Sequence, residues 1–149
     1  MNENLKFLKE VFESESLPEE SLPEFVFWGR SNVGKSSLIN SITKSKIAKT
    51  SKTPGRTRSL VFFEFEKKIR IIDFPGYGYS KIPKLNEFKI DKLIENYLTQ
   101  RQVLKFIFLL IDARHGIMEI DKKILDQLDK ILGSKVIIIF TKIDKLKNQ

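Results

Sequence analysis

The segment FVFWGRSNVGKSSLIN, residues 25–40, constrains the fold of this 149-residue chain more than any other part of it. Its four initial apolar residues predict a buried strand, and the residues after Ser36 predict the first turn of a helix. The eight residues between them fit the pattern G-x-x-x-x-G-K-[ST]. Gly29 and Gly34 allow the backbone to curl so that successive N–H groups converge, and the helix directs its positive dipole end at the same point. We therefore predict a loop that binds phosphate groups.

Two side chains of this loop have distinct expected roles. Lys35 places a positive charge on the β- and γ-phosphates of a nucleotide, and the Ser36 hydroxyl is a ligand for Mg²⁺. The phosphate-binding residues predicted from the loop are Gly29, Arg30, Ser31, Asn32, Val33, Gly34, Lys35 and Ser36.

The composition bounds the class of protein. A content of 41% hydrophobic and 31% charged residues is typical of one globular domain, and the chain has no cysteine for a disulfide or a thiolate metal site. The acidic, amphipathic start argues against a signal peptide, and every apolar run is too short to span a bilayer. We therefore expect a cytoplasmic location and no membrane partner. The net charge of +8 favours an anionic partner, although a general lysine bias explains it equally well.

Strand and helix patterns alternate along the chain. This alternation predicts an α/β fold with a mostly parallel, doubly wound sheet, in which one hairpin turn at Lys67–Lys68 makes one strand antiparallel. The expected strands are residues 25–28, 60–66, 69–73, 105–111 and 135–140, and the expected helices are residues 35–43, 85–102 and 120–132.

The first 23 residues are expected to form an N-terminal extension and linker, followed by one domain over residues 24–149. Leu5, Leu8, Val11 and Phe12 recur at helical spacing, which predicts a short amphipathic helix over residues 4–13. Residues 45–59 lack apolar periodicity and are predicted to form a long polar loop, a type that is usually functional.

Four unusual loops follow predicted strands, and they start at Gly29, Asp73, Asp112 and Thr141. In doubly wound sheets, ligands bind at the carboxyl ends of the strands. We therefore expect these loops to meet at a single site.

The loop from Asp73 to Gly76 has the form D-x-x-G. Taken alone the pattern is weak, because aspartate and glycine begin many turns. Its place after a strand, beyond a phosphate-binding loop, strengthens it. Asp73 is expected to hold Mg²⁺ through a water, and the Gly76 N–H is expected to contact the γ-phosphate.

The loop from Thr141 to Asp144 fits [NT]-K-x-D. The Asp144 carboxylate can accept the N1–H and the 2-amino group of guanine, whereas adenine lacks both donors. Lys142 would lay its aliphatic stem along the base. The sequence therefore favours guanine over adenine and argues against an ATP-using enzyme such as a small kinase.

A second hydroxyl ligand for Mg²⁺ is expected in the polar loop. Thr57 is the best candidate, but Thr50, Thr53 and Ser59 are rivals that spacing alone does not separate.

The motifs GRSNVGKSSLIN, TSKTPGRT, DFPGYGYSK, DARH and TKID, in this order from about Leu22 to Leu146, resemble the EngB family of bacterial GTPases. The resemblance implies a monomeric, Ras-like P-loop G domain that binds GTP and GDP with Mg²⁺. It also implies a role in assembly of the large ribosomal subunit, with contacts to rRNA, and a requirement for normal cell division and septation. It assigns the Mg²⁺ hydroxyls to Ser36 and Thr57, and catalytic roles to Lys35, Thr57 and Gly76.

By the same resemblance, three further groups of residues bind the nucleotide. The first switch comprises Gly55, Arg56, Thr57, Arg58 and Ser59; the second comprises Asp73, Phe74, Pro75 and Gly76; and the base is bound by Thr141, Lys142, Ile143 and Asp144.

Four side chains near the motifs carry further expectations. Tyr77 occupies the position where Ras-type enzymes use a glutamine to orient water, so we expect slow hydrolysis. Asn32 resembles an asparagine that holds K⁺ beside the phosphates in related GTPases. His115, the only histidine, is expected to be structural, and Trp28 is expected to belong to the core.

The family continues past T-K-x-D with a strand, a Ser-Ala-like loop that touches guanine, and a closing helix, whereas this chain ends at Gln149. We therefore expect a C-terminally incomplete G domain that lacks the last strand and helix. Its last strand would have an unpaired edge, and nucleotide binding would be weaker than in a longer relative. The alternative function is a non-hydrolysing module that binds the ribosome or rRNA.

Overall fold

The computed structural model describes residues 4–48, 58–78 and 84–147. Its centre is a six-stranded sheet in the order β1-β3-β4-β2-β5-β6, in which β3 runs antiparallel to both neighbours and the other pairs are parallel. The strands are β1 (Leu5–Val11), β2 (Glu24–Gly29), β3 (Leu60–Phe65), β4 (Ile69–Asp73), β5 (Leu104–Asp112) and β6 (Val136–Thr141). The helices are α1 (Lys35–Thr43), α2 (Lys84–Gln100) and α3 (Glu119–Leu132), with short 3₁₀ turns at Ser14–Ser16, Gly133–Lys135 and Ile143–Lys145.

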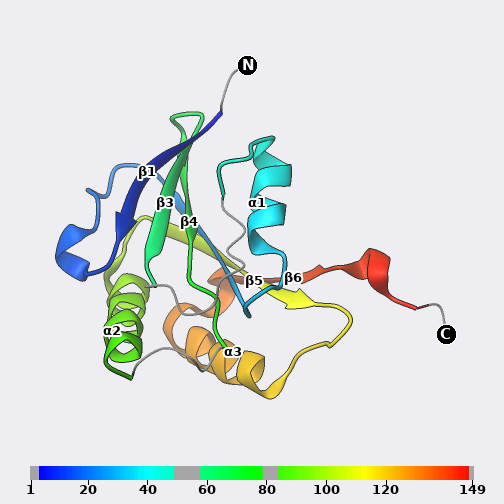
Figure 1. The fold of residues 1–149 in the computed structure, drawn as a ribbon. Helices are drawn as coiled ribbons and strands as arrows, with labels where there is room; N and C mark the ends of the chain where they lie inside the picture. Colours follow the sequence, from blue (N-terminus) through cyan, green and yellow to red (C-terminus); the bar gives the residue numbers. More distant parts are fainter. Residues whose placement is uncertain (1–3, 49–57, 79–83, 148–149) are drawn as a thin grey trace.

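Successive side chains of the central strands point to opposite faces of the sheet, so a hydrophobic core forms on each face. On β2, Val26 and Trp28 face α2 and α3, whereas Phe27 faces α1 together with Ile39. Figure 1 shows α1 separated from α2 and α3 by the sheet. The predicted α/β, doubly wound, mostly parallel sheet with one antiparallel strand is therefore confirmed. The predicted strands and helices from residue 25 onward all form, and their ends differ by one or two residues.

The prediction of a helix over residues 4–13 is wrong, because this segment forms the edge strand β1. A bulge between Phe7 and Lys9 shifts the register against β3 by one residue. Leu5 is therefore buried in the core beside α1, whereas Val11 is buried in the core on the other face. The bulge removes the strict alternation that indicates a strand, and the remaining apolar spacing imitates a helix. Residues 5–11 thus pack into the domain rather than extend from it.

The other edge of the sheet is β6. Among the described residues, no strand pairs with its outer side, and Ile138 and Phe140 are more than one-third exposed. Ile42 of α1 is also exposed, whereas Thr43 of the same helix is buried. Within the described ranges, no helix is long and apolar enough to cross a membrane.

Candidate functional site

The loop between β2 and α1 curls as its glycines predict. Gly34 precedes α1 with a φ of 100°, in the left-handed region that glycine favours. A Cβ at Gly29 would lie 2.8 Å from the Leu110 carbonyl oxygen, so no side chain fits where β2 passes β5. Val33 is buried in the core and anchors the middle of the loop. The loop is therefore held between the sheet and α1.

Lys35 and Asp73, 38 residues apart in the chain, lie in direct contact. Lys35 Nζ is 2.8 Å from Asp73 Oδ1 and also donates a hydrogen bond to the Phe74 carbonyl. Apart from this ion pair, Asp73 Oδ1 is buried without a hydrogen-bond partner in the part of the chain that the structure describes. The Asp73 carboxylate thus lies against Lys35 in the first turn of α1, the turn that also carries Ser36, and carboxylate and hydroxyl oxygens are the hard ligands that Mg²⁺ prefers.

The D-x-x-G loop packs onto the phosphate loop. Phe74 is fully buried, and the Trp28 indole N–H donates to the Pro75 carbonyl at 3.0 Å. Trp28 therefore belongs to the core and also supports this loop. A Cβ at Gly76 would come within 3.0 Å of the Ser31 backbone nitrogen, so only glycine allows the two loops to approach so closely.

Tyr77 points into the protein. Its hydroxyl donates to Asp121 Oδ1 at 2.5 Å, and both side chains are buried. Burial, followed by the hydrogen bond to Asp121, raises the pKa of Tyr77 well above its usual value. The phenol therefore remains protonated and is held against the first turn of α3 by Asp121.

The loop after β6 is tied to the phosphate loop by two side chains. The Thr141 hydroxyl donates to the Val33 carbonyl at 2.7 Å, and Lys142 Nζ donates to the Asn32 carbonyl at 2.7 Å. The two residues that follow, Ile143 and Asp144, are exposed. Thr141 and Lys142 are therefore fixed to the phosphate loop, and the Asp144 side chain is open to solvent two residues beyond Lys142.

Asp112, at the end of β5, organises the cations of this region. Arg114 donates two side-chain hydrogen bonds to its carboxylate, at 3.1 and 2.8 Å, and Lys142 Nζ lies 3.5 Å away. The hydrogen bonds from Arg114 hold the pKa of Asp112 well below its usual range. His115 is exposed, with its Nε2 4.0 Å from Asp112. The sequence marked Asp112 only as the start of a loop; its position opposite Thr141 in neighbouring strands places it beside Lys142.

A cavity lies between the phosphate loop and the loop after β5. Its charged lining residues are Arg30, Arg114 and Lys142, which are positive, and Asp112 and Asp121, which are negative. The lining therefore has a small excess of positive charge, which favours an anionic ligand.

The first switch is described only in part. Gly55, Arg56 and Thr57 lie outside the described residues, and so does the expected second Mg²⁺ hydroxyl. The Ser59 hydroxyl donates to Glu10 Oε1 of β1 at 2.6 Å, which turns it toward the edge of the sheet. No group of three or more carboxylates or histidines that could hold a metal occurs within the described ranges.

A family model described as 50S ribosome-binding GTPase matches residues 24–142, which include the starts of all four loops. The chain is 48% identical over 140 residues to a probable GTP-binding protein EngB of Metamycoplasma arthritidis (strain 158L3-1). That alignment covers 94% of this chain and 76% of that protein.

Two solved structures are similar in fold. A crystal structure of a probable GTP-binding protein EngB aligns with a TM-score of 0.64 and 31% identity, over 84% of this chain and 73% of that one. A crystal structure of Era in complex with MgGDPNP and nucleotides 1506–1542 of 16S ribosomal RNA aligns with a TM-score of 0.61 and 25% identity. That alignment covers 87% of this chain and 43% of that one.

Proposed function

The chain belongs to the EngB family of GTP-binding proteins and has the Ras-like fold of GTPase G domains, and from that premise we propose that the four loops bind GTP and GDP. One observation carries the proposal: Lys35 contacts Asp73 while Lys142 contacts the Asn32 carbonyl. The D-x-x-G motif and the T-K-x-D motif, which are distant in the sequence, thus both contact the phosphate-binding segment.

The proposed roles follow from the chemistry of each group. The loop N–H groups and Lys35 bind the phosphates, which requires Lys35 to exchange the Asp73 carboxylate for phosphate oxygens. Asp144 accepts the guanine donors, and Lys142 lies along the base. Mg²⁺ would be held by the Ser36 hydroxyl, by Thr57, and through water by Asp73. When bound, it neutralises charge on the β- and γ-phosphate oxygens.

Slow GTP hydrolysis is the proposed activity. The buried Tyr77 hydroxyl, which donates to Asp121, supports this proposal because no amide orients the attacking water from that position. A partner or a cation is then needed for rapid turnover. K⁺ held near Asn32 is one such candidate.

The proposed partner is the large ribosomal subunit, acting through rRNA, in subunit assembly and thereby in normal cell division and septation. The +8 charge, the description of the matched family and the rRNA-bound Era structure support it. The alternative remains a non-hydrolysing module that docks on rRNA.

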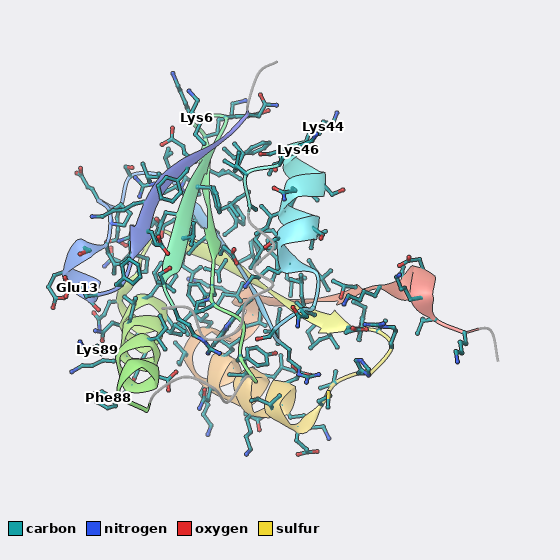
Figure 2. All side chains as sticks on the ribbon, in the orientation of Figure 1. Lys6, Glu13, Lys44, Lys46, Phe88 and Lys89 are labelled. Carbon is teal, nitrogen blue, oxygen red and sulfur yellow. The ribbon has the colours of Figure 1, made fainter. Side chains whose placement is uncertain are left out.

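Calorimetry with GDP, a GTP analogue and ADP in the presence of Mg²⁺ tests nucleotide binding. We expect both guanine nucleotides to bind, ADP not to bind, and Lys35→Ala to abolish binding. Lys46→Ala is the matched control, because Lys46 is exposed beyond the far end of α1 (Figure 2). Equal affinity for GDP and ADP would overturn the proposal.

A second experiment separates the enzyme from the docking module. Multiple-turnover GTP hydrolysis is measured with and without large ribosomal subunits, and subunit binding is measured over a range of salt concentrations. We expect slow turnover that subunits accelerate, and binding that weakens as salt rises. Salt-sensitive binding without any turnover would favour the module.

A further inference from the structure

Asp121, in the first turn of α3, joins two parts of the protein through its two carboxylate oxygens. Oδ1 accepts the Tyr77 hydroxyl at 2.5 Å, and Oδ2 accepts the Met118 backbone N–H at 2.8 Å, before the start of α3. Asp121 is almost fully buried. A buried carboxylate with a donor on each oxygen is stable in this position only while both donors remain, so it fixes Tyr77 relative to α3.

Tyr77 in turn fixes the D-x-x-G loop against the phosphate loop. Its backbone N–H donates to the Gly29 carbonyl at 3.1 Å, and its carbonyl accepts the Ser31 N–H at 3.0 Å. The ring packs edge-on against Trp28, with the ring centroids 5.5 Å apart. Side chain and backbone therefore hold Tyr77 from three sides.

Gly76 immediately precedes Tyr77, so its position follows from that of Tyr77. A Cβ at Gly76 would lie 3.0 Å from the Ser31 backbone, so a side chain there would push the two loops apart. This places Gly76 beside the phosphate loop before any ligand is added. A donor that is already in position binds its acceptor with a smaller loss of conformational entropy.

From these contacts we infer that Asp121 and Tyr77 are positioning residues that hold Gly76 where its N–H meets the terminal phosphate of a nucleoside triphosphate. The inference rests on the proposed nucleotide site and deepens it. Asp121 lines the cavity beside the phosphate loop, but both of its carboxylate oxygens already accept donors from the protein, so its proposed effect on the nucleotide acts through Tyr77. Because the Gly76 N–H contacts only the third phosphate, the pair favours triphosphate over diphosphate. The protein thereby gains discrimination between the two nucleotides from a contact in its core.

The test uses the Tyr77→Phe variant. Calorimetry measures its affinity for a non-hydrolysable GTP analogue and its affinity for GDP, and the ratio of the two is compared with that of the unaltered chain. We expect the analogue to bind about threefold to tenfold more weakly than to the unaltered chain, the range of one net hydrogen bond. The GDP affinity is expected to stay within about twofold, because GDP makes no contact with Gly76. A purely structural role of the hydroxyl would leave the ratio unchanged.

Tyr97→Phe is the matched control. Its hydroxyl donates to the buried Glu24 carboxylate at 2.9 Å, so the substitution also removes a buried tyrosine hydroxyl from a buried carboxylate, but at the amino end of β2. We expect this variant to keep the ratio of affinities. If both variants weaken the analogue and GDP equally, the inference is overturned.

A second variant and a second measurement cover the remaining outcomes. If Tyr77→Phe does not fold, Asp121→Asn is measured in the same way, and an unchanged ratio again overturns the inference. If the unaltered chain binds no nucleotide, the proposed function fails. Hydrogen exchange of the backbone amide at position 77 then decides. Faster exchange in Tyr77→Phe than in Tyr97→Phe supports the positioning role of the Tyr77 hydroxyl, and equal exchange overturns it.

Discussion

The Glu24 carboxylate accepts two hydrogen bonds from the Arg101 guanidinium, at 2.8 and 2.9 Å, at the amino end of β2. Glu24 is fully buried and also contacts Arg70 and the Tyr97 hydroxyl. The phosphate loop follows the opposite end of the same strand. The domain therefore has one buried ionic network for stability and a separate one, around Lys35 and Asp73, for its site.

The first prediction is that Glu24→Gln destabilises the domain by about 3–5 kcal/mol, because it removes the buried carboxylate that pairs with two largely buried arginines. The free energy of unfolding is measured by urea denaturation. Glu119→Gln is the control, since Glu119 pairs with Lys122 through side chains that are 84% and 59% exposed. We expect a change of about 0.5 kcal/mol or less there. Similar losses of unfolding free energy in both variants would contradict the stabilising role of the buried Glu24 network.

Much of the architecture could be predicted from local patterns. The strand–loop–helix unit around Gly34 and Lys35 depends on residues that are adjacent in the sequence, and the carboxyl-end rule then brings Asp73 and Thr141 to the same place. The edge strand β1 could not be predicted, because the bulge near Phe7 removes its period of two and its partners in β3 lie 49 to 60 residues further along the chain.

The polar contacts that support the site were also beyond the sequence pattern. Asp112 and Asp121 stand at ordinary positions, one at a strand end and one in the first turn of a helix. Their importance comes from the partners that the fold supplies, Lys142 and Tyr77. Side chains that act through such long-range contacts carry no spacing signal of their own.

The second prediction concerns the base. Asp144→Asn is expected to weaken GDP binding at least about tenfold and to improve binding of xanthosine diphosphate, because an amide donates to the 2-oxo group that replaces the 2-amino group. Asp126→Asn, an equal change of charge at an exposed site on α3, is the control. The measurement is a competition assay with both nucleotides. Unchanged GDP affinity in Asp144→Asn would remove this residue from the base site.

The third prediction concerns alkaline pH. Burial raises the pKa of Tyr77 and of Tyr97 above the ordinary value of 10.0. The neighbouring carboxylates, Asp121 for Tyr77 and Glu24 for Tyr97, raise it further. Above the ordinary value the unfolded chain loses these protons while the folded chain keeps them, so the free energy of unfolding falls as pH rises. Each tyrosine contributes a slope of about 1.4 kcal/mol per pH unit.

Urea denaturation between about pH 10 and pH 12 checks this dependence. Tyr77→Phe is expected to reduce the slope by the contribution of one proton, and the double variant with Tyr97→Phe by that of two. Identical slopes in all three proteins would mean that neither hydroxyl is buried in the folded state.

The fourth prediction is faster GTP hydrolysis in K⁺ than in Na⁺ at equal ionic strength. Asn32 is exposed on the phosphate loop, with a φ of 66°, and its carbonyl already accepts Lys142 Nζ, so the side-chain amide is the group proposed to face the cation. Asn32→Gly is the diagnostic variant, because glycine tolerates this φ and removes only the amide. We expect it to abolish the difference between the cations. Equal rates in K⁺ and Na⁺ for the unaltered chain would exclude the cation site.

The fifth prediction concerns the outer edge of β6. Ile137, Ile138 and Phe140 are each more than one-third exposed, and among the described residues no strand pairs with this edge, so it offers unpaired backbone groups next to apolar side chains. Such an edge pairs with a second copy at high concentration. The apparent molar mass measured by light scattering should therefore increase with protein concentration. Ile138→Lys should reduce this increase by placing a charge at the edge. Ile42→Lys, on the exposed face of α1, is the control; if it reduces scattering equally, overall charge rather than the strand edge is responsible.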